Sequence, residues 1–137
     1  MEEKHHLFHS IHQLSRNLTK RLNAALEPYE IYSSQWSVLF ILKEKGSMTQ
    51  KELCSYLAIE APPMTRTIQK LQKLGLIEQT EGQDKRKRYI ALTNKALTNY
   101  PVWEKAVMDV NNQISTSLSE NHQKELQMIV SEWLRKL

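Results

Sequence analysis

The stretch that decides the fold runs from Met48 to Thr93 and reads MTQKELCSYLAIEAPPMTRTIQKLQKLGLIEQTEGQDKRKRYIALT. It holds two short helical patterns, a strand, a basic turn and a second strand. Thr49 and Glu52 have the spacing of a capping box, in which each side chain accepts a hydrogen bond from the other residue's backbone N–H. A helix is therefore predicted to begin at Gln50 and to end near Leu57. Its inward positions are expected to bury Leu53, Cys54 and Leu57.

A second helix is predicted after a short turn, from about Ala61 to about Leu74. Pro62 and Pro63 fit only its first turn, where a backbone donor would be unpaired anyway. The residues expected to be buried follow helical spacing and are Met64, Ile68 and Leu71. Two short helices joined by a turn predict a helix-turn-helix.

The outward face of this second helix carries positive charge and no acidic residue between positions 61 and 74. Roughly 140 to 200° from Met64 around the helix axis lie Pro62, Arg66, Gln69 and Lys73, with Pro63, Thr65 and Lys70 on the flanks. A solvent-facing helix usually mixes both signs of charge, so this face favours a polyanion as its partner.

The rest of the stretch predicts a β-hairpin. Gly75 is placed to end the second helix, and Leu76–Thr80 and Arg88–Leu92 read as two strands around a basic turn. An isolated two-stranded ribbon is marginal in water, so it is expected to pack on the helices through apolar residues such as Leu76, Ile90 and Leu92. Helix, turn, helix and hairpin together predict a winged helix-turn-helix.

The chain before this stretch is predicted to form two helices. Apolar residues on one face predict a long helix from about His5 to Leu26, and these residues are Leu7, Ile11, Leu14, Leu18 and Leu22. Pro28 ends it. The next helix has Ser33 or Ser34 as its N-cap and Gly46 as its C-terminal stop.

The last 44 residues are predicted to be helical again, with Thr93 as the first cap and Ser119 as the N-cap of the final helix. Pro101 predicts that the helix after Thr93 either kinks or restarts. One apolar stripe consists of Trp103, Val107, Val110 and Ile114, and the second of Leu126, Ile129, Val130, Trp133, Leu134 and Leu137. These faces are wider than the winged part can cover, so the end helices must cover each other or meet a second subunit, and dimerisation is the simpler expectation.

Composition bounds the function classes. At 137 residues one domain is expected, and the apolar runs are too short to span a bilayer. A single cysteine excludes an intrachain disulfide framework, and with the acidic, His-rich N-terminus it predicts a cytoplasmic protein. Lys and Arg exceed Asp and Glu by three in residues 47–93, eight against five, and the two ends are close to neutral. This distribution is typical of a surface that faces phosphates.

With these elements in order, the chain resembles the MarR family of bacterial winged-helix transcriptional regulators. The segments that match are SSQWSVLFIL, TQKELCSYLAI, APPMTRTIQKLQKLGLIE and DKRKRYIALT, and the resemblance covers nearly the whole chain. Relatives usually place a small residue where this chain has Cys54. The implied fold is mainly α with a small β wing: a winged helix-turn-helix (31–93) flanked by N- and C-terminal dimerisation helices (1–30 and 94–137) in a single domain.

The resemblance also implies a function. The expected protein is a homodimeric regulator, a repressor, whose two winged regions bind a pseudo-palindromic operator in double-stranded DNA. Family members commonly bind a small-molecule effector in a crevice between the dimer helices and the winged region. Neither a cofactor nor membrane attachment is expected.

Candidate DNA-binding residues lie on the second helix of the helix-turn-helix and in the wing. An arginine fork such as that of Arg66 can read a guanine edge or hold a phosphate, and the unpaired N–H groups at a helix start favour a phosphate nearby. Arg86 resembles the family's minor-groove arginine, held by Asp84. The candidates on the helix are Pro62, Pro63, Thr65, Arg66, Gln69, Lys70 and Lys73. Those in the wing are Asp84, Lys85, Arg86, Lys87 and Arg88.

Three other interpretations are open at this point. His5, His9 and His12 share one face of the first helix and would be the start of a metal-sensing site. Cys54 would serve either as a redox sensor or as an inert packing residue. A winged helix can also serve as a protein-interaction module without binding DNA. An enzyme is not expected, because phosphate loops, nucleophile elbows and paired metal motifs are all missing.

Overall fold

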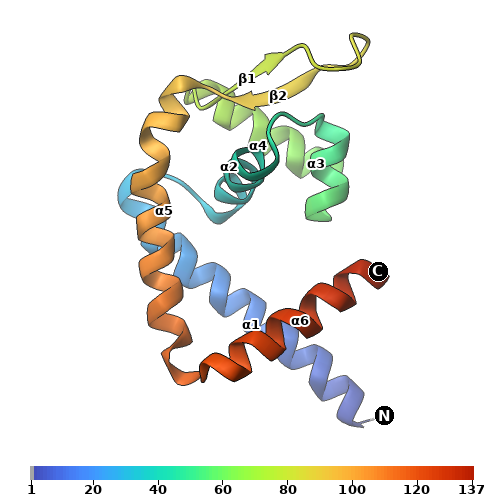
Figure 1. The fold of residues 1–137 in the computed structure, drawn as a ribbon, viewed down its shortest axis with the longest axis vertical. Helices are drawn as coiled ribbons and strands as arrows, with labels where there is room; N and C mark the ends of the chain where they lie inside the picture. Colours follow the sequence, from blue (N-terminus) through green and yellow to red (C-terminus); the bar gives the residue numbers. More distant parts are fainter. Residues whose placement is uncertain (1) are drawn as a thin grey trace.

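The computed structural model describes residues 2–137 and is mainly helical (Figure 1). In chain order its elements are α1 (Glu2–Leu26), the 3-10 turn η1 (Glu27–Tyr29), α2 (Ser33–Lys45), α3 (Gln50–Leu57), α4 (Ala61–Lys73), β1 (Ile77–Thr80), β2 (Tyr89–Leu92), α5 (Asn94–Ile114), the 3-10 turn η2 (Ser115–Ser117) and α6 (Glu120–Lys136). The predicted mainly α fold with a small β wing is confirmed.

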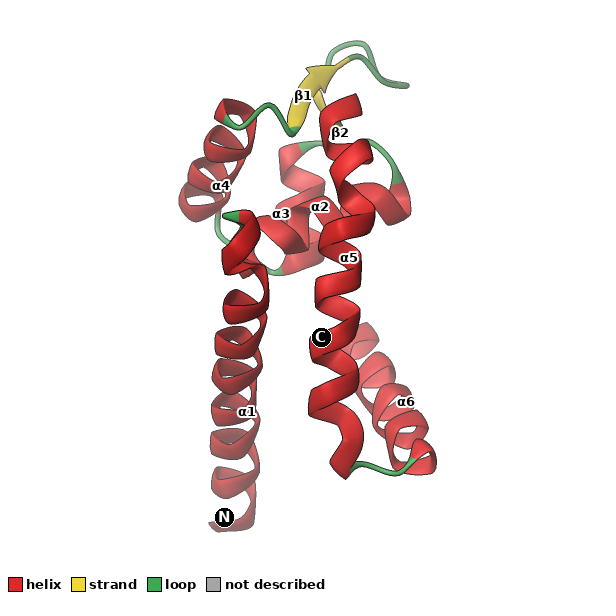
Figure 2. Cartoon of the chain, turned by 90° about the vertical axis from the view of Figure 1, so that its left-hand side faces the viewer, coloured by secondary structure: helices red, strands yellow, loops and turns green. Residues whose placement is uncertain are grey.

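Two parts can be distinguished along the long axis of the molecule. The hairpin and α2–α4 lie at one end, and α1, the end of α5 and α6 form the other (Figure 1). Seen from the side, α1 and α5 run lengthwise beside each other toward the winged end (Figure 2). After η2 the chain turns back, and Trp133 of α6 meets Phe8 of α1 edge to face with ring centroids 5.7 Å apart. Across residues 2–137 we find no helix both long and apolar enough to cross a membrane.

The start of α2 corrects one sequence prediction. The N-cap is Tyr32, not Ser33 or Ser34, and the helix begins one residue earlier than a serine cap would allow. The capping bonds come from amide side chains, since Gln35 Oε1 accepts from the Tyr32 N–H at 3.1 Å and Asn23 Oδ1 of α1 accepts from the Ser33 N–H at 2.7 Å. The first turn of α2 is thus fastened to α1.

The capping box of α3 is formed as predicted. Thr49 Oγ1 accepts from the Glu52 N–H at 3.1 Å, and Glu52 Oε1 accepts from the Thr49 N–H at 3.0 Å. Leu53 is fully buried, but Cys54 and Leu57 are only half-buried, so the prediction that all three are buried is wrong for two of them. Both side chains lie at the edge of the core and pack against it.

The hairpin is antiparallel, with Ile77 opposite Leu92 at its base and Thr80 opposite Tyr89 near its tip. Each strand is one residue shorter than predicted. Met48, just before α3, forms a bridge to β2, in which its N–H donates to the Ile90 carbonyl at 3.1 Å and its carbonyl accepts from the Ile90 N–H at 2.7 Å. The hairpin is therefore joined to the helix-turn-helix by backbone bonds as well as by the buried side chain of Ile90.

Pro101 lies inside α5, and the helix neither ends nor restarts there. Proline removes one i to i−4 hydrogen bond, so the neighbouring packing must keep the two halves of the helix aligned. Tyr100 and Trp103 supply that packing, because both are buried and Tyr100 stacks on Trp36 of α2 with ring centroids 5.2 Å apart. Burial raises the pKa of Tyr100 to about 12, so it stays neutral in this cluster.

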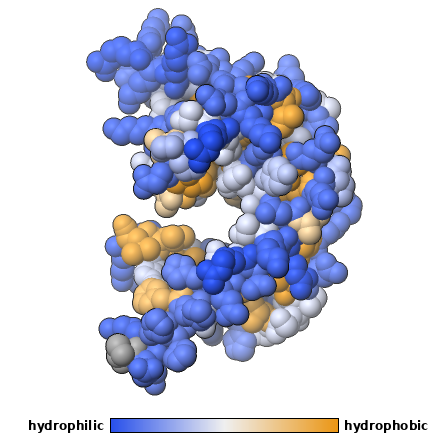
Figure 3. Space-filling view, turned by 180° about the vertical axis from the view of Figure 1, so that it is seen from behind, coloured by the Kyte–Doolittle hydropathy of each residue, from blue (hydrophilic) through white to orange (hydrophobic). Residues whose placement is uncertain are grey.

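The apolar faces of α1 and α6 are left largely uncovered in the single chain. In α1 the exposed side chains are Leu7, Phe8, Ile11, Leu14 and Leu18. In α6 they are Leu126, Ile129, Val130, Trp133 and Leu134. Figure 3 shows apolar residues at the surface of the half of the molecule formed by α1, α5 and α6, whereas the hairpin end is hydrophilic. Apolar patches of this extent mark an interaction surface.

Candidate nucleic-acid interface

The predicted outward face of α4 is exposed in the structure. Met64, Ile68 and Leu71 are buried as predicted, which turns the polar side of the helix to solvent. The exposed candidates are Pro62, Arg66, Gln69, Lys70 and Lys73, and the half-buried ones are Pro63 and Thr65. Because α4 carries Arg66, Lys70 and Lys73 and no acidic residue, its net charge is positive.

Thr65 has a structural partner that sequence reasoning missed. Its Oγ1 accepts a hydrogen bond from Gln50 Nε2 of α3 at 2.7 Å. This bond joins the first turn of α3 to the second turn of α4, and it fixes the side of α4 that flanks the outward face. Gln50 was missed because the capping-box pattern describes only contacts within α3, whereas this contact joins two helices.

Lys70 lies at the rim of a crevice between α1, the α1–α2 turn and α4. The crevice has a volume of about 780 Å³, and we call it the α1–α4 crevice. Its lining residues are Lys20, Asn23, Ala24, Glu27, Glu30, Ile31, Tyr32, Lys70 and Leu74. The Lys70 ammonium lies 5.8 Å from the centroid of the Tyr32 ring, within the range of a cation–π contact. One lysine thus borders both the outward face of α4 and the crevice.

Arg86 lies exposed in the turn of the wing. The guanidinium forms a two-pronged ion pair with Asp84, with Nε 3.1 Å from Oδ1 and Nη2 3.1 Å from Oδ2, and the Arg86 N–H also donates to Oδ1 at 3.0 Å. The Arg86 side chain is nevertheless 90% exposed. These bonds from Arg86 lower the pKa of Asp84, and the carboxylate in turn raises the pKa of Arg86. Both groups therefore remain charged at neutral pH.

The other basic residues of the wing are exposed as well. Lys85 and Lys87 flank Arg86 in the turn. Hydrogen bonds with Thr49 are the main cause of the lowered pKa of Glu52 in α3, and the positive charge of Lys87 makes a smaller contribution. Arg88 has a partner within the hairpin, since its Nη1 donates to Gln79 Oε1 at 3.2 Å. Gln79 lies on the neighbouring strand, so Arg88 braces the ribbon across its width.

The tip of the wing depends on the absence of a side chain at Gly82. A Cβ at that position would lie 2.5 Å from two ring atoms of Tyr89. The same tyrosine reaches the turn through its hydroxyl, which accepts from the Asp84 N–H at 3.4 Å. Gly82 and Tyr89 thus set the path of the chain that carries Asp84 and Arg86.

The histidines do not gather into a metal site. Within residues 2–137, no group of three or more His, Cys, Asp or Glu side chains is placed to hold a metal ion. The rings of His5 and His6 meet edge to face with centroids 6.2 Å apart, so His5 packs on its neighbour in sequence. The interpretation of His5, His9 and His12 as a metal sensor has no support from this arrangement.

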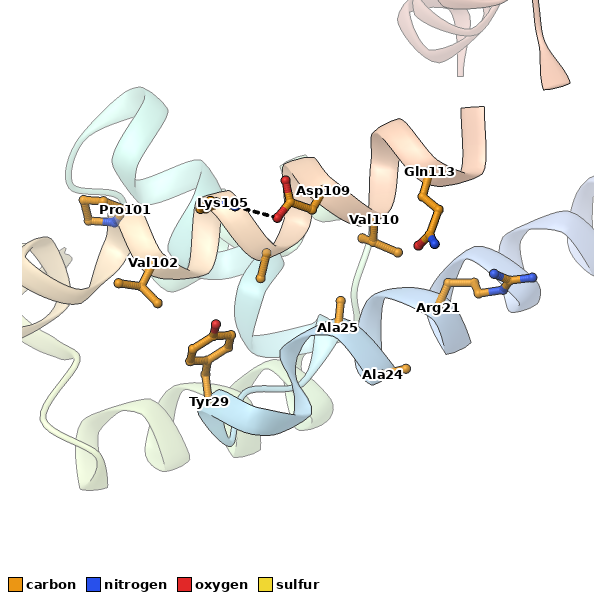
Figure 4. Close-up of a pocket in the computed structure, with 11 residues that line it drawn as sticks. Arg21, Ala24, Ala25, Tyr29, Pro101, Val102, Lys105, Asp109, Val110 and Gln113 are labelled. Carbon is orange, nitrogen blue, oxygen red and sulfur yellow. Dashed lines mark hydrogen bonds and ion pairs between the residues drawn. The ribbon is translucent and has the colours of Figure 1, made fainter. Parts of the chain in front are cut away.

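A further hollow lies between α1 and α5 (Figure 4). This α1–α5 cleft has a volume of about 640 Å³ and small apolar walls, with Ala24 and Ala25 on α1 opposite Val102 and Val110 on α5. Lys105 and Asp109 form an ion pair of 2.8 Å along its rim.

Comparison with known proteins agrees with this architecture. The MarR family model matches residues 31–88. The chain is 48% identical over 95 residues to the uncharacterized HTH-type transcriptional regulator YwoH of Bacillus subtilis strain 168, and the match covers 69% of each chain.

Solved structures of MarR proteins have the same fold as this chain. A mutant of MarR from E. coli complexed with operator DNA has a TM-score of 0.83 with this chain, at 23% identity over 93% of both chains. A MarR transcriptional regulator from Methanosarcina mazei Go1 also has a TM-score of 0.83, at 25% identity over 98% of this chain and 93% of that one. The identity to the Bacillus protein and the family model together show that this chain belongs to the MarR family of transcriptional regulators.

Proposed function

We propose that the protein is a homodimeric repressor that binds a pseudo-palindromic operator in double-stranded DNA. The observation that carries the proposal is the acid-free, exposed face of α4 together with a wing turn in which the Arg86 side chain is 90% exposed. A helix of this kind fits the major groove, and an arginine at the tip of a hairpin fits the adjacent minor groove. Two fold relatives were solved with DNA, the mutant of MarR from E. coli with its operator and AbfR in its reduced form.

In this proposal the residues divide by task. Arg66 and Gln69 lie at the centre of the exposed face of α4 and are assigned to base edges. Lys73, Lys85 and Lys87 are assigned to phosphates, and Arg86 to the minor groove. Pro62 and Pro63 place the first turn of α4 with its unpaired N–H groups toward the backbone. Thr65, Lys70 and Arg88 support these contacts from the flanks, because each has a partner within the chain.

The uncovered apolar faces support the dimer. The exposed leucines of α1 and the stripe of α6 are continuous surfaces that a second copy of this chain can cover with the same surfaces of its own. The α1–α5 cleft adds a groove with small apolar walls between two helices of the proposed dimer part. A two-fold dimer would present two α4 helices to successive major grooves, about 34 to 36 Å apart.

The α1–α4 crevice supports a ligand response. It lies between a helix of the proposed dimer part and α4, so a small molecule bound there would favour one position of α4 over another. Ligand and DNA then weaken each other's binding by the same factor, as linkage requires. A regulator of this kind acts in the cytoplasm, where a bacterial chromosome is accessible.

Selection of bound genomic fragments is the experiment that tests the proposal. Purified protein is mixed with sheared genomic DNA from its own source, and enriched fragments are sequenced. We expect one or a few inverted repeats that the protein binds at least about 1,000-fold more tightly than random duplex. Arg66→Ala should lose this preference, whereas Arg16→Ala, which removes the same charge from α1 opposite its leucine stripe, should keep it. Equal binding to all fragments would contradict the proposal.

A further inference from the structure

Several backbone carbonyl groups at the end of α4 accept hydrogen bonds. The Leu76 N–H donates to the Leu71 carbonyl and the Gly75 N–H to the Gln72 carbonyl, each at 3.0 Å, with Gly75 at a φ of 73°. This is a complete Schellman motif, which ends the helix and uses two of its last carbonyls. The carbonyls of Leu74 and Gly75 remain available to groups from outside α4.

Two side chains at the start of α5 donate hydrogen bonds to these two carbonyl groups. Lys95 Nζ donates to the Leu74 carbonyl at 2.7 Å, and Thr93 Oγ1 donates to the Gly75 carbonyl at 2.6 Å. The Thr93 N–H donates to the Leu76 carbonyl at 3.1 Å. We call these five residues, Leu74, Gly75, Leu76, Thr93 and Lys95, the α4–α5 junction.

The bonds of the junction depend on a hydroxyl group at position 93 and an ammonium group at position 95. The Thr93 hydroxyl donates to Gly75 and also accepts from the Ala96 N–H at 3.2 Å, so one group caps α5 and fastens α4. The ammonium of Lys95 lies at the negative end of the α4 dipole, where a cation is favoured. Its stem passes Gly75, and Lys95 Cδ lies 3.7 Å from where a Cβ on that glycine would be.

The junction lies where the chain enters and leaves the hairpin. The chain leaves α4, forms the hairpin and returns to α5 at the same point, since Ile77 and Leu92 pair at the base of the ribbon. Without side-chain bonds, α4 and α5 would be connected there mainly through a two-stranded ribbon, which twists easily. The bonds of Thr93 and Lys95 fasten α4 directly to α5.

We propose that Lys95 is a positioning residue that fixes the direction of α4 relative to α5 and thereby sets the half-site spacing that the dimer accepts. The inference rests on the proposed function, because spacing has meaning only for two α4 helices on one DNA. Lys95 itself touches no DNA in this proposal. It acts through the end of α4, and its loss leaves both the DNA-facing residues and the apolar faces intact.

The first test compares operators of different spacing. A palindrome is obtained by selection from randomised duplex DNA with the wild-type protein, and derivatives are made with one or two base pairs added to or removed from its centre. Each base pair moves the half-sites by about 3.4 Å and rotates them by about 35°. We expect the wild-type protein to prefer the parent palindrome by about tenfold or more, and Lys95→Met to reduce that ratio to about threefold or less.

Controls separate positioning from other roles. Lys95→Arg keeps a cationic donor and should retain most of the wild-type preference for the parent palindrome. Asn94→Ala is the control at the neighbouring exposed position. A merely structural role would lower the unfolding temperature and weaken all operators equally, which leaves the ratio unchanged. A phosphate contact would lower the salt slope by about one, again with the same ratio. Either result overturns the proposal.

The second test needs no DNA. In a Cys54→Ser background, a spin label is attached at Gln72→Cys on the exposed side of α4, and the distance between the two labels of a dimer is measured by pulsed electron resonance. Lys95→Met should broaden the distance distribution relative to the wild-type junction. An unchanged distribution overturns the positioning role even if DNA binds as proposed. A broadened distribution in a protein that selects no operator would instead contradict the proposed function alone.

Discussion

Arg86 and Asp84 form a closed pair at the tip of the wing, with two guanidinium–carboxylate bonds of 3.1 Å and the arginine 90% exposed. The carboxylate holds the guanidinium at one place on an otherwise mobile side chain. An exposed ion pair contributes little to the stability of the fold. Its value lies in presenting a charged group in a defined position before DNA is bound.

Arg86→Ala should therefore weaken operator binding without changing the unfolding temperature. If the arginine lies against phosphates in the minor groove, the slope of log affinity against log salt should fall by about one. Fluorescence anisotropy at several salt concentrations measures both quantities. Arg16→Ala removes the same charge from α1 and should leave the slope unchanged. An unaltered slope and affinity in Arg86→Ala would exclude the wing from DNA binding.

Gly82→Ala should displace the tip of the wing, because the new Cβ would meet the Tyr89 ring at 2.5 Å. We expect several-fold weaker operator binding with an unchanged dimer mass. The matched experiment is a double-mutant cycle with Tyr89→Ala, which removes the obstructing ring. Gly82→Ala should have little further effect in that background. If Gly82→Ala lowers operator affinity equally with and without the Tyr89 ring, the contact between position 82 and the ring is not the cause.

Glu52 gives a prediction about pH. The backbone N–H of Thr49, followed by its hydroxyl, lowers the pKa of Glu52 below its usual value of 4.5. A group whose pKa is lower in the folded state adds stability above its unfolded pKa and loses that stability as the pH falls through the folded pKa. The wild-type protein should thus be more stable than Glu52→Gln at pH 7, and the difference should shrink as the pH falls below 4.5 and through the lowered pKa of Glu52. Urea unfolding at several pH values measures this, and a constant difference would contradict it.

The same cap can be tested from its other side. Thr49→Ala removes the hydroxyl that accepts from the Glu52 N–H and should cost about 1 kcal/mol in the free energy of unfolding. Thr49→Ser keeps the hydroxyl and should cost much less. The comparison is made by urea unfolding at pH 7, and equal losses in the two variants would mean that the hydroxyl is not the stabilising group.

Val130→Asp should separate the proposed dimer. Val130 lies in the apolar stripe of α6 and is 40% exposed in the single chain, so an aspartate there can fold but opposes burial against a second copy. Light scattering should report a dimer for the wild-type protein and a monomer for the variant. Met128→Asp, on the opposite face of α6 and 71% exposed, is the control that should remain a dimer. A monomeric wild-type protein would contradict the homodimer.

The elements that could be predicted from the sequence are those fixed by nearby residues. The capping box at Thr49 and Glu52 fixed the start of α3, the two prolines fixed the start of α4, and Thr93 and Ser119 are the caps they were predicted to be. The buried side of α4 followed from its spacing alone. In each case the signal lies within one or two helical turns.

The features that could not be predicted depend on contacts between elements. Asn23 of α1 caps α2, so the start of that helix cannot be read from its own serines. Tyr100 and Trp103 are held by the core, which lets α5 continue through Pro101. Gln50 and Lys95 are ordinary polar residues in the sequence, and only the fold brings them to Thr65 and Leu74.

The bridge between Met48 and Ile90 makes β2 a strand with neighbours on both sides. The Ile90 N–H is bonded to Met48 at 2.7 Å, so it cannot exchange its proton with solvent unless the segment before α3 separates from the hairpin. The base of the wing therefore opens only together with the entry to the helix-turn-helix. Hydrogen exchange at this one amide would report the cooperative opening of the whole winged unit.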